Sequence, residues 1–230
     1  MKNYIVVGGT SGIGLELTKK LSNEGNNVYV ISRESKNIDD LENVFHLSVD
    51  VTKPFETTGL PEEIHGLAYC AGSINLKPFH RFSDEDFESD FQVNVMGAVR
   101  IVRENIKALK AGNASLVFFS TVAVSQGMSF HASVAAAKGG VEGLAKSIAA
   151  EYAPKIRANV IAPSLTDTPM ADKLLSNDKK REASSERHPL KRVGNAEELA
   201  SIAHFLLSEK SGWITGQVLG VDGGMSALRP

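Results

Sequence analysis

Short apolar runs alternate along the chain with longer segments whose apolar residues recur every three or four positions. The short runs have the length and β-branched content of buried strands, and the longer segments have the period of a helix face. Strands are predicted at residues 5–7, 28–31, 44–49, 67–70, 116–119, 156–161 and 218–221. Because helical segments separate them, the strands are expected to form a parallel sheet covered by helices on both faces, a doubly wound α/β fold.

Helical segments begin at Ile13, Ser83, Val134 and Asn195. Ser83 and Asn195 are typical N-cap residues, and acidic residues follow each of them. The second segment keeps apolar residues on one side up to Gly112, so it is predicted as a single long helix. Residues 38–43 are expected to form at most a short helix, and residues 52–65 are too interrupted by Pro and Gly for a helical crossover.

The first predicted strand runs directly into the glycine-rich turn Gly8-Gly9-Thr10-Ser11-Gly12-Ile13-Gly14, which opens into the first helix. Glycine tolerates positive φ and has no Cβ, so the backbone can turn tightly and its N–H groups can approach a pyrophosphate at the positive end of the helix. Gly14, inside the helix, allows close packing against the strand. The stretch indicates a dinucleotide-binding site, with a purely structural turn as the alternative.

The end of the second strand carries the residues that choose between the two nicotinamide dinucleotides. A carboxylate there typically binds the ribose 2′-hydroxyl of NAD, whereas a cation favours the 2′-phosphate of NADP. The chain has Ser32-Arg33-Glu34 at this point. Arg33 can donate a charge-assisted pair of hydrogen bonds to a phosphate, and Ser32 leaves room beside it. NADP is therefore the predicted cofactor, and Glu34 keeps NAD as the alternative.

Composition removes several classes of function. The 230 residues suit one domain, residues 1–230, and a net charge of −2 gives no electrostatic case for binding nucleic acid or an anionic membrane. No apolar run approaches the ~18 residues of a membrane span, and the N-terminus has no signal-like segment, so a cytoplasmic protein is expected. Cys70 is the only cysteine and the six histidines lack metal-ligand spacing, so neither a disulfide nor a metal site is expected.

The residues that follow the predicted strands complete the pattern of a known family, and ligands of such sheets bind at this edge. With its glycine-rich turn, the chain resembles a short-chain dehydrogenase/reductase from end to end, in Asp50-Val51, Ala71-Gly72, Asn94, Lys138, Pro163, Thr168, Ile214-Thr215-Gly216-Gln217 and Val221-Asp222-Gly223-Gly224. The resemblance implies a Rossmann-type, nicotinamide-binding fold with strand order 3-2-1-4-5-6-7. It also implies a homotetramer or homodimer that acts on a small carbonyl or alcohol substrate.

The resemblance also implies which positions hold the cofactor. Lys138 is expected to hold the nicotinamide ribose, and the remaining positions are expected to line the rest of the dinucleotide. The full set is Gly8, Thr10, Ser11, Gly12, Ile13, Gly14, Ser32, Arg33, Asp50, Val51, Ala71, Gly72, Lys138, Pro163 and Thr168.

The same resemblance places the chemistry around Lys138. In the family, a tyrosine four residues before this lysine exchanges a proton with the substrate oxygen, a serine donates a hydrogen bond to that oxygen, and an asparagine anchors a proton-relay water. Here Asn94 and Lys138 are retained, Thr121 stands at the serine position, and Val134 stands at the tyrosine position. Valine has no proton to exchange, so ordinary carbonyl reduction is expected to be impaired.

Two replacements for the missing acid are open. Imidazole titrates near neutral pH, which makes His131, just before the third helix, one candidate, and Lys138 acting through a water with Thr121 as donor is the other. Ser133 is expected to point elsewhere, because it lies about 100° round the helix from the tyrosine position. Each candidate also has a structural interpretation: His131 as an exposed loop residue, Thr121 as a strand-end hydroxyl, and Asn94 as a core amide.

The substrate itself is not identified by the sequence. The resemblance implies that residues 164–189 carry substrate contacts; they are expected to form a mobile lid, with Met170, Leu174 and Leu175 able to face a ligand. The leading hypothesis is an NADP(H)-dependent oxidoreductase acting on a carbonyl or secondary alcohol, with an altered proton-transfer site. A catalytically silent NADP(H)-binding protein, working as a sensor or partner subunit, is the second hypothesis. A non-redox acid–base enzyme on the same scaffold is the third.

Overall fold

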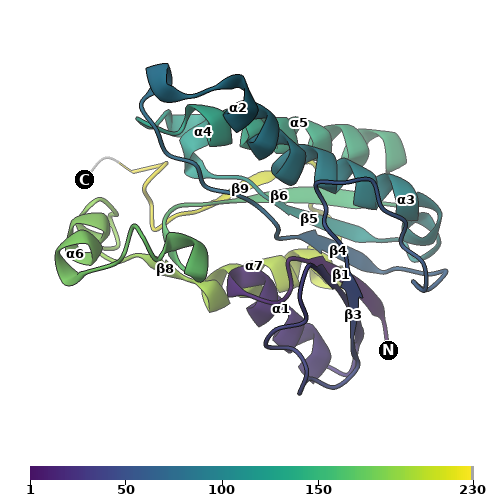
Figure 1. The fold of residues 1–230 in the computed structure, drawn as a ribbon. Helices are drawn as coiled ribbons and strands as arrows, with labels where there is room; N and C mark the ends of the chain where they lie inside the picture. The colour runs from purple at the N-terminus through teal and green to yellow at the C-terminus, as the bar shows by residue number, and fades with distance from the viewer. Residues whose placement is uncertain (229–230) are drawn as a thin grey trace.

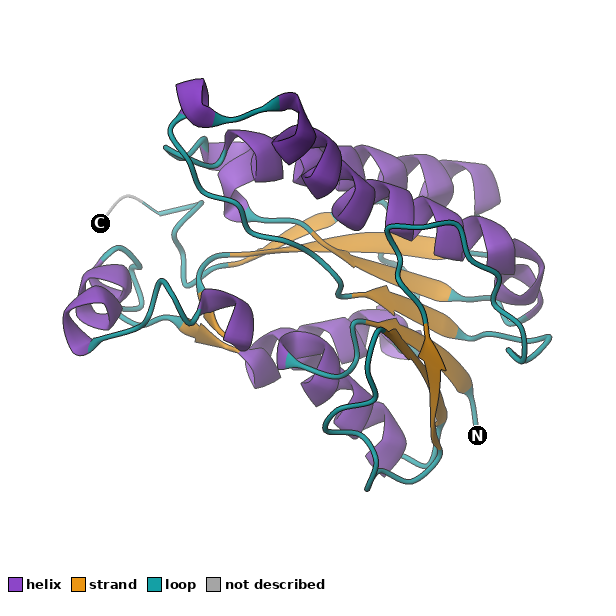
Figure 2. Cartoon of the chain, in the orientation of Figure 1, coloured by secondary structure: helices purple, strands orange, loops and turns teal. Residues whose placement is uncertain are grey.

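Seven parallel strands form the central layer of the molecule, and helices cover both of its faces (Figure 1, Figure 2). The computed structural model describes residues 1–228. The strand order is β3-β2-β1-β4-β5-β6-β9, which confirms the predicted order 3-2-1-4-5-6-7. The strands are β1 (Asn3–Val7), β2 (Asn27–Ser32), β3 (Val44–Ser48), β4 (Gly66–Tyr69), β5 (Ser115–Phe119), β6 (Arg157–Pro163) and β9 (Val218–Val221). The doubly wound parallel sheet is therefore confirmed.

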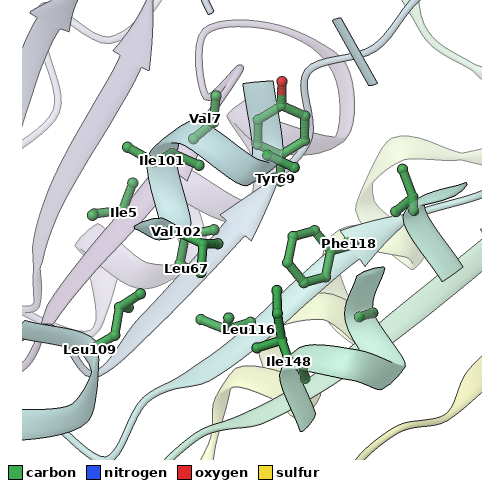
Figure 3. Close-up of a cluster of buried hydrophobic side chains, with 14 of the residues drawn as sticks. Ile5, Val7, Leu67, Tyr69, Ile101, Val102, Leu109, Leu116, Phe118 and Ile148 are labelled. Carbon is green, nitrogen blue, oxygen red and sulfur yellow. The ribbon is translucent and has the colours of Figure 1, made fainter. Parts of the chain in front are cut away.

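Two hydrophobic cores lie on opposite faces of this sheet. One face is covered by α1 (Gly12–Asn23) and α7 (Ala196–Leu207), and the other by α2 (Asp84–Phe91), α3 (Gly97–Ala111) and α5 (Ala132–Tyr152). Alternate residues of β1 enter the two cores, as the pleat of a strand requires. Tyr4 and Val6 pack on the α1 and α7 side, whereas Ile5 and Val7 pack with Ile101 on the other side, which Figure 3 shows.

The helix predicted over residues 83–112 is interrupted once. It consists of α2, a π-helical turn over Gln92–Met96 and α3, so the prediction of a single helix was wrong. The Tyr69 hydroxyl donates a hydrogen bond to Val93 O at 2.5 Å, and a Cβ on Gly97 would lie 2.1 Å from that hydroxyl. A side chain that bonds into the carbonyl ladder of a helix widens the turn locally. The absence of a side chain at Gly97 gives Tyr69 the room to do so.

Shorter elements connect the long ones. They are η1 (Phe79–Arg81), α4 (Val122–Gln126), β7 (Thr166–Asp167), η3 (Pro169–Ala171), α6 (Asp178–Glu186), β8 (Gly194–Asn195) and η4 (Glu209–Ser211). β7 and β8 pair with each other in a separate two-stranded parallel sheet. Residues 38–43, where at most a short helix was expected, form turns, and residues 52–65 contain no helix, as expected. The predicted Asn195 cap is confirmed, because its Oδ1 accepts a hydrogen bond from Glu198 N at 2.9 Å.

Two further observations hold for residues 1–228. No helix in this range combines the length and the apolar character needed to cross a membrane. Nor does the range contain a group of three or more His, Cys, Asp or Glu side chains arranged to hold a metal ion. The structure therefore offers neither a membrane-spanning helix nor a clustered metal site within the described residues.

Candidate active site

A cavity of about 960 Å³ lies along the carboxyl ends of the strands of the large sheet. All residues predicted to hold the cofactor line it: Gly8, Thr10, Ser11, Gly12, Ile13, Gly14, Ser32, Arg33, Asp50, Val51, Ala71, Gly72, Lys138, Pro163 and Thr168. Of the predicted catalytic residues, Thr121, His131 and Lys138 also line the cavity. Asn94 does not, because it lies behind the wall and is fully buried. The fold thus brings residues from distant parts of the chain to one place.

The glycine-rich turn forms the floor of the cavity where α1 begins. Gly8 has φ +78°, and a Cβ there would lie 2.9 Å from Ala71 N. A Cβ on Gly14 would lie 2.2 Å from Gly8 O, so no other residue fits between α1 and the strand. The first N–H groups of a helix have no partner within it and attract anions. This backbone therefore fits the pyrophosphate of a dinucleotide.

The far end of the cavity, beyond β2, carries two cations. Arg33 and Lys36 both line it, and Arg33 has no ion-pair partner within residues 1–228. Glu34, which kept NAD open as an alternative, forms an ion pair with Lys36. The Lys36 ammonium holds the pKa of the Glu34 carboxyl below its ordinary value. Sequence reasoning missed Lys36, because it lies beyond the strand-end residues Ser32-Arg33-Glu34.

Lys138 projects from α5 to the opposite end of the cavity. Its side chain is buried, and Nζ donates a hydrogen bond to Phe119 O at 2.8 Å. Burial lowers the pKa of Lys138 to about 8, and the nearby negative charge of Asp90 partly opposes this effect. Burial also raises the pKa of the Cys70 thiol to about 12, so this neighbour stays protonated and inert. The pKa of Lys138 therefore lies much closer to neutral pH than that of an exposed lysine.

Asn94 lies in the π-helical turn with one polar atom unsatisfied. Its Nδ2 donates to Asp90 O at 2.8 Å and to Ser73 Oγ at 2.9 Å. Its Oδ1 is buried and has no hydrogen-bond partner among residues 1–228. A Cβ on Gly72 would lie 3.1 Å from this Oδ1 and 3.2 Å from Lys138 Nζ, so both atoms face the same bare stretch of backbone. A buried orphan acceptor of this kind fits a bound water or a ligand group.

Thr121 and Val134 form the wall near Lys138. Thr121 is the N-cap of α4, and its Oγ1 accepts a hydrogen bond from Ala123 N at 3.3 Å. The hydroxyl hydrogen therefore remains available to a ligand in the cavity. Val134 lies one helical turn before Lys138, lines the cavity and is nearly inaccessible to solvent. This wall offers the hydroxyl of Thr121 and the ammonium group of Lys138, but Val134 contributes only methyl groups.

The two other side chains considered as replacement acids behave differently. His131 occupies the N-cap position of α5 and lines the cavity, with Nδ1 2.7 Å from Ser129 O. If Nδ1 carries the proton, Nε2 is the free acceptor. Ser133 is buried and donates to Asp90 Oδ2 at 2.6 Å, away from the cavity. The expectation that Ser133 points elsewhere is confirmed.

The segment expected to carry the substrate contacts meets the cavity at several points. Met170 and Leu174 line it as expected, whereas Leu175 is buried and does not, so that prediction was wrong. Arg187 and Met225 also line the cavity and were missed, because neither belongs to a recognisable pattern. The polar part of the segment forms α6, a capped helix. This part of the cavity thus combines thioether and aliphatic groups with one guanidinium.

Known proteins resemble the chain over its whole length. The family model described as Enoyl-(Acyl carrier protein) reductase matches residues 7–226. The 3-oxoacyl-(acyl-carrier-protein) reductase MabA of Mycobacterium bovis is 31% identical and is aligned over 97% of this chain and 92% of its own length. The corresponding reductase FabG of Thermotoga maritima is 32% identical, over 97% of each chain.

Solved structures agree with the sequence relatives. The aldohexose dehydrogenase of Thermoplasma acidophilum, in ligand-free form, superposes with a TM-score of 0.89 at 29% identity, covering 100% of this chain and 95% of its own. The match of the family model, the relatives and this structure extends across both the glycine-rich turn and the Lys138 region. The chain therefore belongs to the short-chain dehydrogenase/reductase family of oxidoreductases.

Proposed function

We propose that the chain is an NADP(H)-dependent oxidoreductase that interconverts a carbonyl and a secondary alcohol, and that its proton-transfer site works without a hydroxyl group at residue 134. The observation that carries the proposal is that the glycine-rich turn and the buried ammonium of Lys138 lie on one cavity. A nicotinamide dinucleotide supplies or accepts hydride when bound. The turn would hold its pyrophosphate, and Lys138 would hold the nicotinamide ribose.

The preference for NADP rests on charge. Arg33 and Lys36 lie at the end of the cavity beyond β2, and the only carboxylate of Ser32-Arg33-Glu34 is already paired with Lys36. A 2′-phosphate adds negative charge that these cations attract, whereas a bare ribose hydroxyl gains little from them. NAD is the weaker alternative.

The proton is the harder part of the reaction. Reduction adds hydride to the carbonyl carbon and a proton to the oxygen, and we propose that the Thr121 hydroxyl donates a hydrogen bond to that oxygen while Lys138 is the proton source. The pKa of Lys138, about 8, is close to working pH, which is where general acids are most effective. His131 is the alternative source, because it lines the same cavity.

The substrate class follows from the lining and from the relatives. Two relatives are 3-oxoacyl-(acyl-carrier-protein) reductases, and the similar solved structure is an aldohexose dehydrogenase. The substrate end here is formed by Met170, Leu174 and Met225, with Arg187 as the charged group. We propose a partly apolar carbonyl compound, with β-ketoacyl thioesters as the first class to test.

A homo-oligomer completes the proposal. The exposed side of α2 presents Phe91, which is 43% exposed and lies beside Gly140 of α5. A Cβ on Gly143 would meet nothing within 4 Å, so this helix side leaves space for a second copy. We propose a homodimer or homotetramer, and light scattering after size-exclusion chromatography measures the mass. A monomer at micromolar concentration would contradict it.

A catalytically silent NADP(H)-binding protein is the second candidate. The observation in its favour is Val134, an aliphatic residue in the wall beside Thr121 and Lys138. General acid catalysis is typically worth 10²–10⁴-fold, so its loss would leave a binding protein.

One experiment separates the two. NADPH consumption is followed over ketones, aldehydes and β-ketoacyl thioesters for the natural chain and for Val134→Tyr, with Val134→Phe as the control for side-chain size. We expect turnover by the natural chain. Turnover by Val134→Tyr alone would favour the silent NADP(H)-binding protein. If neither the natural chain nor Val134→Tyr binds NADPH or NADH, both candidate functions are contradicted and non-redox chemistry is favoured.

A further inference from the structure

A buried carboxylate lies next to the proton-transfer site and has no part in the function proposed above. Asp90 of α2 is 2% exposed. Its Oδ1 accepts a hydrogen bond from Ser73 Oγ at 2.6 Å, and its Oδ2 accepts one from Ser133 Oγ at 2.6 Å. Burying a carboxylate is unfavourable unless hydrogen bonds compensate it, and neutral side chains would fasten α2 to α5 without that penalty. We therefore expect the Asp90 carboxylate to do more than attach α2 to α5.

Hydrogen-bond directions connect this carboxylate to Asn94. An ionised carboxylate can only accept hydrogen bonds, so the Ser73 hydroxyl must donate its single hydrogen to Asp90. Ser73 Oγ can then only accept from Asn94, and the group 2.9 Å away must be the amide nitrogen. The second hydrogen of Nδ2 goes to Asp90 O, at 2.8 Å. Both amide hydrogens are thereby directed toward α2 and Ser73.

The direction of the Asn94 amide oxygen follows from these hydrogen bonds. With Nδ2 held on two acceptors, Asn94 Oδ1 must point the other way, toward Gly72. Lys138 Nζ faces the same point of the backbone, so the two atoms lie at most about 6.3 Å apart, the sum of the 3.1 and 3.2 Å distances. A reversed amide would present hydrogen-bond donors to an ammonium group, which repel it. The orientation of the Asn94 amide thus decides whether a hydrogen-bond acceptor or a donor faces Lys138.

We propose that Asp90 is a positioning residue for proton transfer, which acts through Ser73 to lock the Asn94 amide with its oxygen toward Lys138. The locked oxygen is an acceptor for an Nζ hydrogen or for a water that Nζ also binds, and it keeps the ammonium group in one place beside the cavity. The assignment of proton transfer to Lys138 rests on the proposed function, but the lock itself does not.

Two serines give a matched test. Ser73→Ala and Ser133→Ala each remove one hydroxyl hydrogen bond from the same carboxylate. Ser73 also accepts a hydrogen bond from Asn94, whereas the Ser133 hydroxyl bonds, among residues 1–228, only to Asp90 and to the Asp86 carbonyl. A carboxylate that merely fastens α2 to α5 predicts equal effects, or a larger effect for Ser133→Ala. A lock on the amide predicts an effect for Ser73→Ala alone.

The first readout is the titration of Lys138 in the cofactor-free protein, followed by NMR with labelled lysine and assigned with Lys138→Met. The groups that bear on Nζ are the Cys70 thiol after β4 and the Asp90 carboxylate of α2. Glu142, one turn along α5, accepts a hydrogen bond from Ser120 Oγ. We expect Ser73→Ala to lower the Lys138 pKa, and Asp90→Asn, which also removes the charge, to lower it by about one. Ser133→Ala is expected to leave it in place.

The second readout is turnover. We expect Ser73→Ala and Asp90→Asn to lower kcat about tenfold with KM for NADPH within about twofold, because neither Ser73 nor Asp90 is among the residues proposed to hold the dinucleotide. Ser73→Thr keeps the hydroxyl and is expected to restore kcat. Equal effects of Ser73→Ala and Ser133→Ala on the titration, or no shift in either, would overturn the lock. A protein that turns nothing over contradicts the proposed function instead, and the titration still decides the lock.

Discussion

The two ends of the cavity are built by different means. The dinucleotide end is made of backbone and surface cations: the glycine-rich turn, with Gly14 against the strand, and Arg33 in solvent. The proton-transfer end is made of hydrogen-bonded side chains. Asn94 Nδ2 donates to Ser73 Oγ, Ser73 Oγ donates to Asp90 Oδ1, and Lys138 Nζ donates to Phe119 O. The first end depends on the path of the backbone and on exposed positive charge. The second is expected to tolerate neither loss of a charge nor reversal of an amide.

The sharpest way to break the dinucleotide end is Gly14→Ala. A Cβ at this position would lie 2.2 Å from Gly8 O, so α1 must move away from the turn. We expect NADPH binding to fall at least about 100-fold, or the protein to fail to fold. Fluorescence titration of NADPH measures the first outcome and circular dichroism the second. Retained NADPH binding by a folded Gly14→Ala variant would contradict this account.

The corresponding change at the other end is Lys138→Met. It keeps the length of the side chain but removes the ammonium, and we expect kcat to fall about 10²–10⁴-fold. The wild-type kcat for reduction is expected to decline as pH rises through about 8, since the ammonium is the proton donor. Stopped-flow measurements of NADPH oxidation between pH 6 and 10 test both points. A pH-independent kcat would remove Lys138 from proton transfer.

The same lysine predicts a pH-dependent stability. Its pKa is about 8 in the fold and about 10.5 in the unfolded chain, so the unfolded state binds the extra proton between these values. The free energy of unfolding therefore rises with pH across this window, by about 3 kcal/mol from this group. Below pH 8 the burial penalty is present in full. Urea unfolding of wild type and Lys138→Met at pH 7 and pH 10 isolates the contribution of the lysine. The difference in the free energy of unfolding between the two proteins should be smaller at pH 10 than at pH 7.

The same contrast explains what could be predicted from the sequence. The dinucleotide end could be predicted because its parts are contiguous: an apolar run, glycines and a helix pattern occur within residues 5–21. The caps and strands are local signals of the same kind. Lys36 was missed because it lies beyond Ser32-Arg33-Glu34, the stretch that the strand-end rule for cofactor choice covers.

The proton-transfer end could not be predicted from the residues alone, because its parts come from four separate segments. Asp90 belongs to an acidic, helix-starting stretch and has the appearance of a solvent-exposed residue, yet the fold buries it between Ser73 and Ser133. The π-helical turn was missed for a related reason. The apolar spacing continues unbroken through residues 91–99, and only the hydroxyl of Tyr69, from another strand, widens the helix.

The next test addresses cofactor choice at the exposed end. We expect Arg33→Ala to weaken NADPH binding about tenfold or more and to change NADH binding by less than about twofold, because only NADPH carries the 2′-phosphate. Lys36→Ala is expected to have a smaller effect of the same sign, since that lysine also pairs with Glu34. Binding constants for both dinucleotides, measured by calorimetry at fixed salt, decide it. Equal losses for NADPH and NADH would mean that Arg33 does not meet the phosphate.

The smallest expected effect concerns His131, and it tells the two proton sources apart. Its imidazole lines the cavity but is tethered to Ser129 O, and it starts α5 instead of lying buried within the site. If Lys138 supplies the proton, His131→Ala removes only a contact, and we expect KM for the carbonyl to rise about threefold while the pH midpoint of kcat stays where it is. If kcat instead falls by about 100-fold or more and its pH midpoint is displaced, the role of acid passes from Lys138 to His131.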